Sequence, residues 1–293
     1  MPRQSASQLP ETWINIDALD WKRREASGPR ATEERHMGQP PLIVFTDLDG
    51  TLLDHDSYSP EAARPALDRL AAAGVPLILA SSKTAAEIDR LRDSIGCAGR
   101  PAIVENGAGL LEAGPDGGAR DYARLLEAIE QVSPYIRSYF IGFSELGVTG
   151  VARVTRLPPE EAALAARRQF SEPGLWQGGP EEHYDFLQAL GQLGVTGRLG
   201  GRFLTLSFGG SKADRMDEIA ARYGDPPRLA LGDAPNDREM IEAAEFGVIV
   251  ANPHGSPLPP LPGEKTGRIS RTTAPGPEGW NAAVLDLLDT LDI

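Results

Sequence analysis

The stretch PLIVFTDLDGTLLD, residues 41–54, places a short apolar run directly before three acidic residues, Asp47, Asp49 and Asp54, around a Gly-Thr turn. A continuous apolar run such as LIVF (42–45) is typical of a strand that is buried on both faces of a parallel sheet. Like charges gathered at the tip of such a strand repel one another and do not stabilise the fold. The stretch therefore predicts a buried strand whose end carries chemistry.

Alternating strands and helices follow this stretch and return near the C-terminus. The first series consists of a helix at 59–74, a strand at 75–80, a helix at 84–96 and a strand at 101–109. The second series consists of a helix at 211–224, a strand at 228–237, a helix at 237–246, a strand at 247–252 and a helix at 279–293. Strands separated by helices at this spacing imply right-handed crossovers. We therefore expect an α/β fold with a doubly wound parallel sheet.

The pattern changes between these two series, which predicts an inserted module. Helical segments such as ARLLEAIEQV (123–132) occur there together with strand-like segments such as VTGRLGG (195–201) and RFLTLSFG (202–209). We expect an inserted α+β cap at 111–203, core segments at 41–110 and 204–293, and a polar N-terminal arm at 1–40.

The composition excludes several classes of protein. The 293 residues, 41% of them hydrophobic, suffice for one large α/β domain or two smaller ones. A formal net charge of −13 argues against general nucleic-acid binding, which requires a basic surface. The single cysteine, Cys97, excludes an internal disulfide. Because the chain shows neither a run of about 18 apolar residues nor an apolar signal core, we expect a cytoplasmic protein without a membrane span.

Polar and charged residues follow four of the predicted strands. They are Asp47 and Asp49; Ser81, Ser82 and Lys83; Glu105 and Asn106; and Asp233, Asn236 and Asp237. The carboxyl ends of parallel strands form the ligand crevice, so these side chains should converge. Two carboxylates about 4 Å apart repel by roughly 4 kcal/mol at an effective dielectric near 20, so a cation should bridge them. Oxygen ligands without cysteine favour Mg²⁺, which in turn implies a phosphate ligand.

These residues suggest a reaction at phosphorus. Asp47 can attack phosphorus and form an aspartyl-phosphate, while Asp49 can protonate the leaving oxygen and later deprotonate water. Lys212 can neutralise the transferring group, and Ser81 can donate to a phosphoryl oxygen. Gly50 and Thr51 shape the turn. The predicted metal ligands are Asp47, Asp49, Asp233 and Asp237, with Asn236 in support.

Four short motifs then resemble the haloacid dehalogenase (HAD) superfamily of phosphotransferases. They are DLDGT (47–51), Ser81 after an apolar strand, Lys212 at the start of a helix, and GDAPND (232–237). The resemblance covers residues 42–110 and 205–252. It implies the fold predicted above and an Mg²⁺-dependent aspartyl-phosphate route.

A finer resemblance is to the mannosyl-3-phosphoglycerate phosphatase family of the Cof-like HAD phosphatases. It is carried by FTDLDGTLLDHDSYS (45–59), ASSKTAAEI (80–88), IVENGAG (103–109) and RRQFSEPGLW (167–176). The resemblance implies that Ser81 contacts phosphate and that Lys83 contacts substrate. It also implies that the cap segment 167–173, with Arg168 and Ser171, faces the sugar or glycerate carboxylate. Ala213 stands where many relatives place glycine, and the arm has no recognised counterpart.

The residues also allow simpler structural roles. Ser81 could cap the following helix, and Ser82 could make the phosphate contact in its place. The expected substrate-binding residues are Gly50, Thr51, Ser82, Lys83, Glu105, Asn106, Arg168 and Ser171. The sequence Glu105-Asn106-Gly107 could instead merely close a strand. Lys83 and Arg168 could be ordinary surface charges.

The resemblance implies hydrolysis of mannosyl-3-phosphoglycerate to phosphate and mannosylglycerate, which serves as a compatible solute. The alternatives are a glucosyl-3-phosphoglycerate phosphatase, a phosphatase or phosphomutase for another sugar phosphate, and a non-catalytic sugar-phosphate sensor. The expected partner is a small phosphorylated sugar or glycerate derivative, and a homodimer is compatible with the sequence.

Overall fold

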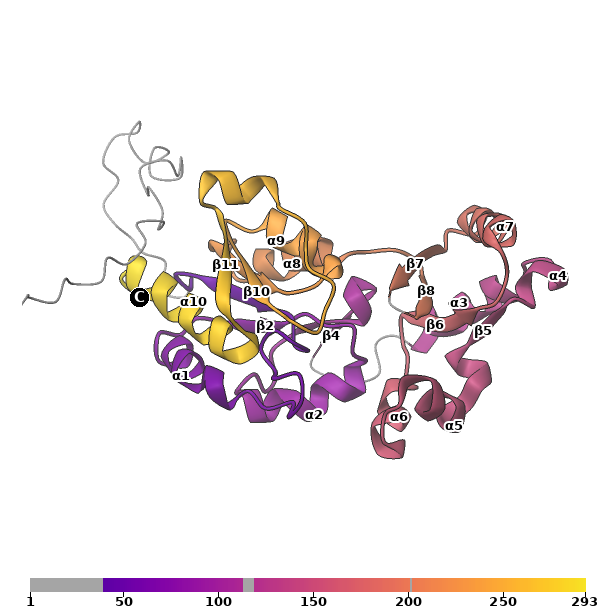
Figure 1. Ribbon diagram of the computed structural model, residues 1–293, viewed down its shortest axis with the longest axis horizontal. Helices are drawn as coiled ribbons and strands as arrows, with labels where there is room; N and C mark the ends of the chain where they lie inside the picture. Colours follow the sequence, from indigo (N-terminus) through magenta and orange to yellow (C-terminus); the bar gives the residue numbers. More distant parts are fainter. Residues whose placement is uncertain (1–38, 113–118, 201) are drawn as a thin grey trace, which may run out of the picture.

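The computed structural model describes residues 39–112, 119–200 and 202–293, and a parallel five-stranded sheet forms its core (Figure 1). The strand order is β11 (Ile269–Pro275), β10 (Phe246–Ala251), β9 (Arg228–Gly232), β1 (Ile43–Thr46) and β2 (Leu77–Leu79). Every neighbouring pair in this sheet is parallel, which confirms the predicted fold class. Apart from Gln39 and Pro40, the predicted arm at 1–40 lies outside the described residues.

A short hairpin adjoins the outer edge of β2. Strand β3 (Ala102–Val104) reaches the sheet through a parallel bridge between Ala80 and Ile103, and β4 (Gly109–Leu111) returns antiparallel to it. The turn of this hairpin is the 3-10 helix η4 (Glu105–Gly107). The other 3-10 helices with assigned bounds are η3 (Glu61–Ala63), η5 (Pro235–Asp237) and η6 (Pro262–Thr266).

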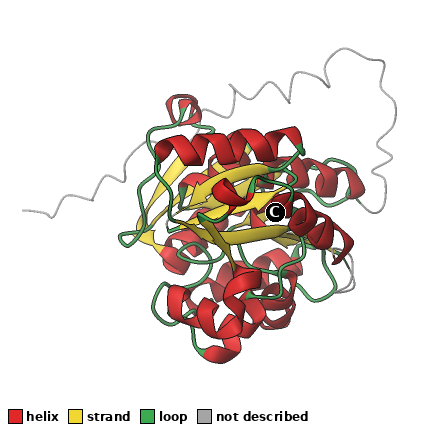
Figure 2. Ribbon diagram, turned by 90° about the vertical axis from the view of Figure 1, so that its right-hand side faces the viewer, coloured by secondary structure: helices red, strands yellow, loops and turns green. Residues whose placement is uncertain are grey.

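Helices cover both faces of the parallel sheet, which is the doubly wound arrangement (Figures 1 and 2). One face carries α1 (Arg64–Ala72), α2 (Ala85–Ile95) and α10 (Gly276–Thr290), and the other carries α8 (Lys212–Arg222) and α9 (Arg238–Ala243). Val44 of β1 packs in the apolar cluster of the first face and Phe45 in that of the second, because successive strand residues point to opposite faces. None of the helices in the described ranges is long and apolar enough to cross a membrane.

A second, antiparallel sheet lies beyond the carboxyl edge of the first, and we call this part the cap (Figure 1). Its strands follow the order β5 (Phe140–Gly142), β6 (Ser171–Trp176), β8 (Phe203–Ser207) and β7 (Thr196–Gly200). Its helices are α3 (Ala119–Glu130), α4 (Pro134–Arg137), α5 (Phe143–Thr155), α6 (Pro159–Ala165) and α7 (Pro180–Gln192). The cap has apolar clusters of its own, such as the one around Phe140 and Phe186. Its sheet takes in all of β8 and so extends past residue 203.

The C-terminal helix α10 is held to the first strand by a buried hydrogen bond. The Trp280 side chain is fully buried, and its Nε1–H donates to Oγ1 of Thr46 at 2.9 Å. The Thr46 hydroxyl donates in turn to the carbonyl of Asp47 at 2.7 Å. Helix α10 thereby fixes the point at which the chain leaves β1.

Replacing Trp280 with phenylalanine should therefore destabilise the protein by about 2 kcal/mol, because Thr46 would lose its buried donor. The free energy of unfolding in urea measures this loss. Trp176→Phe is the matched control, since among the described residues the Trp176 indole nitrogen is buried without a hydrogen-bond partner. Equal losses in the two variants would contradict a role for the Trp280 hydrogen bond.

Candidate active site

Three aspartates meet at the carboxyl ends of two neighbouring strands. Asp47 is the first residue after β1, Asp233 is the first after β9, and Asp237 is the last residue of η5. Because β1 pairs with β9 in register, their ends lie side by side. One carboxylate oxygen of each aspartate lies within 4.8 Å of those of the other two, and all three residues are buried. This group could hold a metal ion.

Lys212 joins two of these aspartates. Its Nζ lies 2.7 Å from Oδ1 of Asp47 and 2.6 Å from Oδ1 of Asp237, and its side chain is buried. The lysine is the first residue of α8, where the Ser211 side chain accepts a hydrogen bond from the backbone N–H of Asp214 and Asp214 reciprocates. This capping box fixes where the helix begins and therefore where the ammonium lies.

Burial and charge act in opposition on these groups. Burial raises the pKa of Asp47 well above its ordinary value of 3.8, and the Lys212 ammonium opposes that rise. Burial alone would lower the pKa of Lys212, but Asp237 and Asp47 outweigh it and raise that pKa. Three carboxylates against one ammonium leave a net charge of −2 in the ionised cluster. One divalent cation would neutralise this charge.

The Asp237 carboxylate already has partners on both oxygens. Oδ1 accepts from Lys212, and Oδ2 accepts from the backbone N–H groups of Asp233 (3.1 Å) and Ala234 (3.0 Å). Gly232 is required beside it, because a Cβ there would lie 2.4 Å from the Asp237 Cβ. Asp237 thus braces the loop that presents Asp233.

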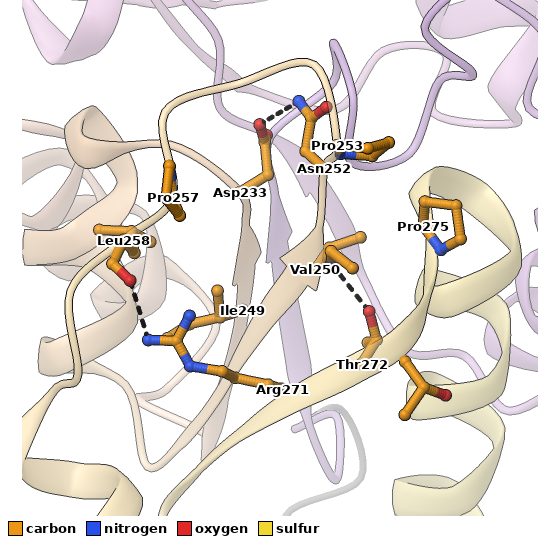
Figure 3. A pocket seen from close by; sticks show the side chains of 12 residues that line it. Asp233, Ile249, Val250, Asn252, Pro253, Pro257, Leu258, Arg271, Thr272 and Pro275 are labelled. Atoms are coloured by element: carbon orange, nitrogen blue, oxygen red, sulfur yellow. Dashed lines mark hydrogen bonds between the residues drawn. The ribbon is translucent and has the colours of Figure 1, made fainter.

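Asp233 is oriented by two side chains. Thr51 Oγ1 donates to its Oδ1 at 2.6 Å, and Asn252 Nδ2 donates to its Oδ2 at 2.7 Å (Figure 3). Burial raises the pKa of Asp233, and these two hydrogen bonds oppose the rise. Gly50 is needed for this contact: its φ is +80°, and a Cβ there would lie 2.4 Å from Asn252 Nδ2.

Asn252 is a site residue that the sequence reasoning missed. It follows β10, the strand beside β9, so its position at a strand end was the available signal. It also borders a cavity of about 380 Å³ between the 252–258 loop and β11 (Figure 3). Arg271 lines this cavity but is paired with Glu264 and with the Leu258 carbonyl. The Arg271 guanidinium is therefore already paired and is not a free cation for a ligand in this cavity.

Asp49, a predicted metal ligand, lies outside the three-aspartate group. Its Oδ2 lies 2.9 Å from Lys83 Nζ, and 40% of its side chain is exposed. Among the described residues its Oδ1 is buried without a hydrogen-bond partner. The Lys83 ammonium also lies over the Tyr58 ring, 5.5 Å from its centroid. The partly exposed Asp49 and the mostly buried Lys83 thus form a separate ion pair.

Ser81 is buried after β2 and does not cap the next helix. Thr84 does so instead, through a capping box with Glu87. The backbone N–H of Lys83 donates to Ser81 Oγ at 3.3 Å, whereas Ser82 is exposed. Of the two serines, Ser81 is therefore held in the more fixed position.

Asn106 and Asn236 lie together between two strand-end loops. Asn236 Nδ2 donates to Oδ1 of Asn106 at 3.0 Å. This bond links the turn after β3 to the loop that carries Asp233 and Asp237. In this structure Asn236 therefore supports the loop.

Three of the predicted substrate contacts lie against one another. The Glu105 carboxylate accepts from Ser171 Oγ at 2.7 Å, and the Arg168 Nε lies 3.4 Å from Oε2 of Glu105. Arg168 also donates to Ser171 Oγ at 2.7 Å. The structure thus brings Glu105, Arg168 and Ser171 together at the junction of core and cap, apart from the three-aspartate group.

Removing the lysine charge should strongly destabilise the protein. Lys212→Met would leave Asp47 and Asp237 buried without their cation, and we expect a loss of about 3–5 kcal/mol in the free energy of unfolding at neutral pH. The loss should shrink as the pH falls, because the Asp47 carboxyl, whose pKa burial raises, then takes up a proton. Lys265→Met at an exposed position is the control, with an expected change within about 0.5 kcal/mol. A pH-independent loss at Lys212 would contradict the electrostatic explanation.

Comparisons with known proteins agree with this fold. Residues 44–116 match the family of haloacid dehalogenase-like hydrolases. A phosphatase of the HAD superfamily from Bacteroides thetaiotaomicron is 18% identical, with a TM-score of 0.58 over 91% of this chain and 99% of its own. The sucrose-phosphatase of Synechocystis is 16% identical, with a TM-score of 0.54 over 86% and 98%.

A subclass IIB sugar phosphatase of the same superfamily is 17% identical, with a TM-score of 0.54 over 85% of this chain and 98% of its own. At these identities the likeness concerns the fold. The chain therefore has the fold of the HAD superfamily, in which a parallel core sheet is joined to a cap.

Proposed function

We propose that the protein is an Mg²⁺-dependent phosphatase that hydrolyses a phosphorylated sugar derivative through an aspartyl-phosphate on Asp47. The observation that carries this proposal is the meeting of Asp47, Asp233, Asp237 and Lys212 at two adjacent strand ends. Such a group joins a nucleophile, a fixed positive charge and oxygen ligands for a cation, which are the requirements of phosphoryl transfer.

The residues fit Mg²⁺ by charge and by ligand type. The ionised cluster carries a net charge of −2, and its ligand atoms are all oxygens, which Mg²⁺ prefers. Asp47, Asp233 and Asp237, whose carboxylate oxygens lie within 4.8 Å of one another, would hold the ion. The hydrogen bonds that Asp233 and Asp237 already accept would fix the positions of their oxygens. When bound, the ion neutralises charge on the phosphoryl oxygens.

The reaction follows in two steps. Oδ2 of Asp47 attacks phosphorus while Lys212 holds Oδ1, and the bond from phosphorus to the substrate oxygen breaks as that oxygen takes a proton from Asp49. A water molecule then loses a proton to Asp49 and attacks phosphorus, which releases phosphate and restores Asp47. Movement of Lys83 from Asp49 to an anionic group of the substrate would free Asp49 to carry the proton.

Phosphorylated sugars are the substrate class that the similar structures favour. The similar structures include the sucrose-phosphatase, solved with sucrose and phosphate, and the subclass IIB sugar phosphatase. Within this class we propose mannosyl-3-phosphoglycerate, because the segment 167–176 resembles the cap motif of that family. Glucosyl-3-phosphoglycerate, plain hexose phosphates and phosphoryl transfer between sugars are the competing activities.

Asp47→Asn should abolish turnover, because an amide cannot form the acyl-phosphate. We expect phosphate release to fall by about a thousandfold or more, which corresponds to ~4 kcal/mol in the activation barrier. The assay uses mannosyl- and glucosyl-3-phosphoglycerate and plain hexose phosphates, and Asp56→Asn at an exposed position is the control. Full activity in Asp47→Asn would reject the mechanism, and a strong preference for a plain hexose phosphate would reject the proposed substrate.

Added Mg²⁺ should raise the thermal midpoint of the metal-free protein, and more so at higher pH. Burial raises the pKa of Asp47 and Asp233 above 3.8, so the folded protein keeps these protons to higher pH than the unfolded chain. Without a cation, stability therefore falls as the pH rises from 3.8 through the raised values. At a concentration of 100 times its Kd, the ion restores about 2.7 kcal/mol.

Scanning fluorimetry at about pH 5 and about pH 8, with NaCl of equal ionic strength as the reference, measures this shift. Asp233→Asn should lose the Mg²⁺ response, whereas Asp225→Asn, at an exposed position, should keep it. An identical response in the two variants would place the ion elsewhere.

A further inference from the structure

One three-residue turn, Glu105–Gly107, contacts three parts of the molecule at once. Glu105 contacts the cap, and Asn106 binds Asn236 in the loop of the acidic cluster. Gly107 lies against the start of α8: a Cβ there would lie 2.1 Å from the backbone carbon of Ser211. The turn therefore lies between the cap, the acidic loop and the helix that begins at Lys212.

The Glu105 carboxylate is enclosed by donors from a single cap segment, residues 168–171. It accepts from three consecutive backbone N–H groups, those of Gln169 (2.9 Å), Phe170 (3.1 Å) and Ser171 (2.7 Å). The Ser171 hydroxyl adds a fourth hydrogen bond and the Arg168 guanidinium adds an opposite charge. The carboxylate is fully buried, and a buried charge needs such a set of partners.

The apolar part of the same segment also rests on the core. Phe170 packs against the apolar cluster of the core, and a Cβ at Gly109 would lie 2.2 Å from its ring. Two further hydrogen bonds run along this edge: Arg168 donates to the Ser82 carbonyl at 3.4 Å, and Thr84 Oγ1 donates to the Leu164 carbonyl at 3.0 Å. The cap therefore rests on the segment that follows Ser81.

The backbone of the turn is strained. Glu105 has φ of +52° and Asn106 has φ of +59°, and Gly107 follows with φ of +89°. Residues other than glycine adopt this region at a cost, asparagine more readily than glutamate, and such a conformation persists where the surroundings enforce it. The enforcing contacts are the backbone hydrogen bonds from Glu105 N–H to the Lys83 carbonyl (3.0 Å) and from Asn106 N–H to the Ser81 carbonyl (2.9 Å), together with the side-chain contacts of Glu105 with residues 168–171.

We propose that Glu105 is a positioning residue: it holds the cap segment 168–171 on the core and thereby sets the cap position that large substrates need at Asp47. This inference rests on the proposed phosphatase function. Glu105 acts through the cap and does not contact the reacting atoms. A substrate that fills only the phosphate site depends little on the cap, whereas a phosphorylated disaccharide-like substrate depends on it.

Glu105→Gln tests the proposal, because the amide keeps the shape of the side chain but removes the charge and turns one oxygen into a donor. Glu172→Gln is the matched control, since Glu172 is also a buried carboxylate and its side-chain hydrogen-bond partners among the described residues, Ser144 and Tyr122, both lie within the cap. Ser171→Ala is a milder variant that removes one hydrogen bond and leaves the others.

Hydrogen exchange at the amides of 169–171 is the first measurement and needs no substrate. We expect exchange in Glu105→Gln to be faster by about a hundredfold, and in Ser171→Ala by about fivefold, relative to the wild type. Glu172→Gln should leave these amides protected. Unchanged protection in Glu105→Gln would overturn the proposal.

The second measurement compares a large substrate with a small one. In Glu105→Gln we expect kcat/KM for mannosyl-3-phosphoglycerate to fall at least about tenfold, mainly through KM, while that for p-nitrophenyl phosphate changes less than about twofold. Equal losses for both substrates would overturn the positioning role. Failure of the wild type to hydrolyse either substrate would count against the proposed function, and the exchange data would still decide whether Glu105 holds the cap.

Discussion

The buried contacts of Lys212 with Asp47 and Asp237 are the constraint on which the rest of the site depends. Charges persist in a dry interior only where opposite charges are close, and Nζ lies 2.7 Å and 2.6 Å from the two carboxylates. Because Asp47 follows β1, Asp237 ends η5 and Lys212 begins α8, one ammonium joins three separate segments. Lys212 does not neutralise the whole cluster, since Asp233 adds a third carboxylate. The same arrangement that joins the segments therefore also creates the demand for a divalent cation.

The parallel core and its acidic cluster were predictable because strand ends in a parallel sheet converge whatever the details of packing. From this general rule we predicted that Asp47 lies near Asp233 and Asp237, which follow it nearly two hundred residues later in the sequence, and the three carboxylates do lie together. The rule did not place Asp49, because the chain leaves the strand after Thr46 and turns at Gly50, so that Asp49 meets Lys83. Side-chain direction beyond a strand end depends on the turn, which residue spacing does not reveal.

Contacts between the core and the cap were not predictable from the sequence. Glu105 carries a signal for chemistry, a carboxylate after a buried strand, but its partners lie more than sixty residues later in the insertion. No periodic pattern links the two segments. The strand-like segment RFLTLSFG (202–209) was expected in the insertion, but the expected bound at residue 203 falls at the start of β8. Local pattern identifies an element well, but it does not say which sheet the element joins.

The separation of the two apolar cores explains why a few polar contacts matter so much. The core and the cap each bury their own clusters, and Phe170 is the cap residue that packs on the core cluster among the described residues. Apolar burial therefore stabilises mainly the two parts separately. Directional contacts such as those of Glu105 and Thr84 act together with Phe170, and with the packing of α6 against α2, to set their relative position. A chain of net charge −13 also repels an anionic substrate at long range. Binding of the substrate must then rely on short-range contacts within the site. The position of the cap therefore affects substrate binding.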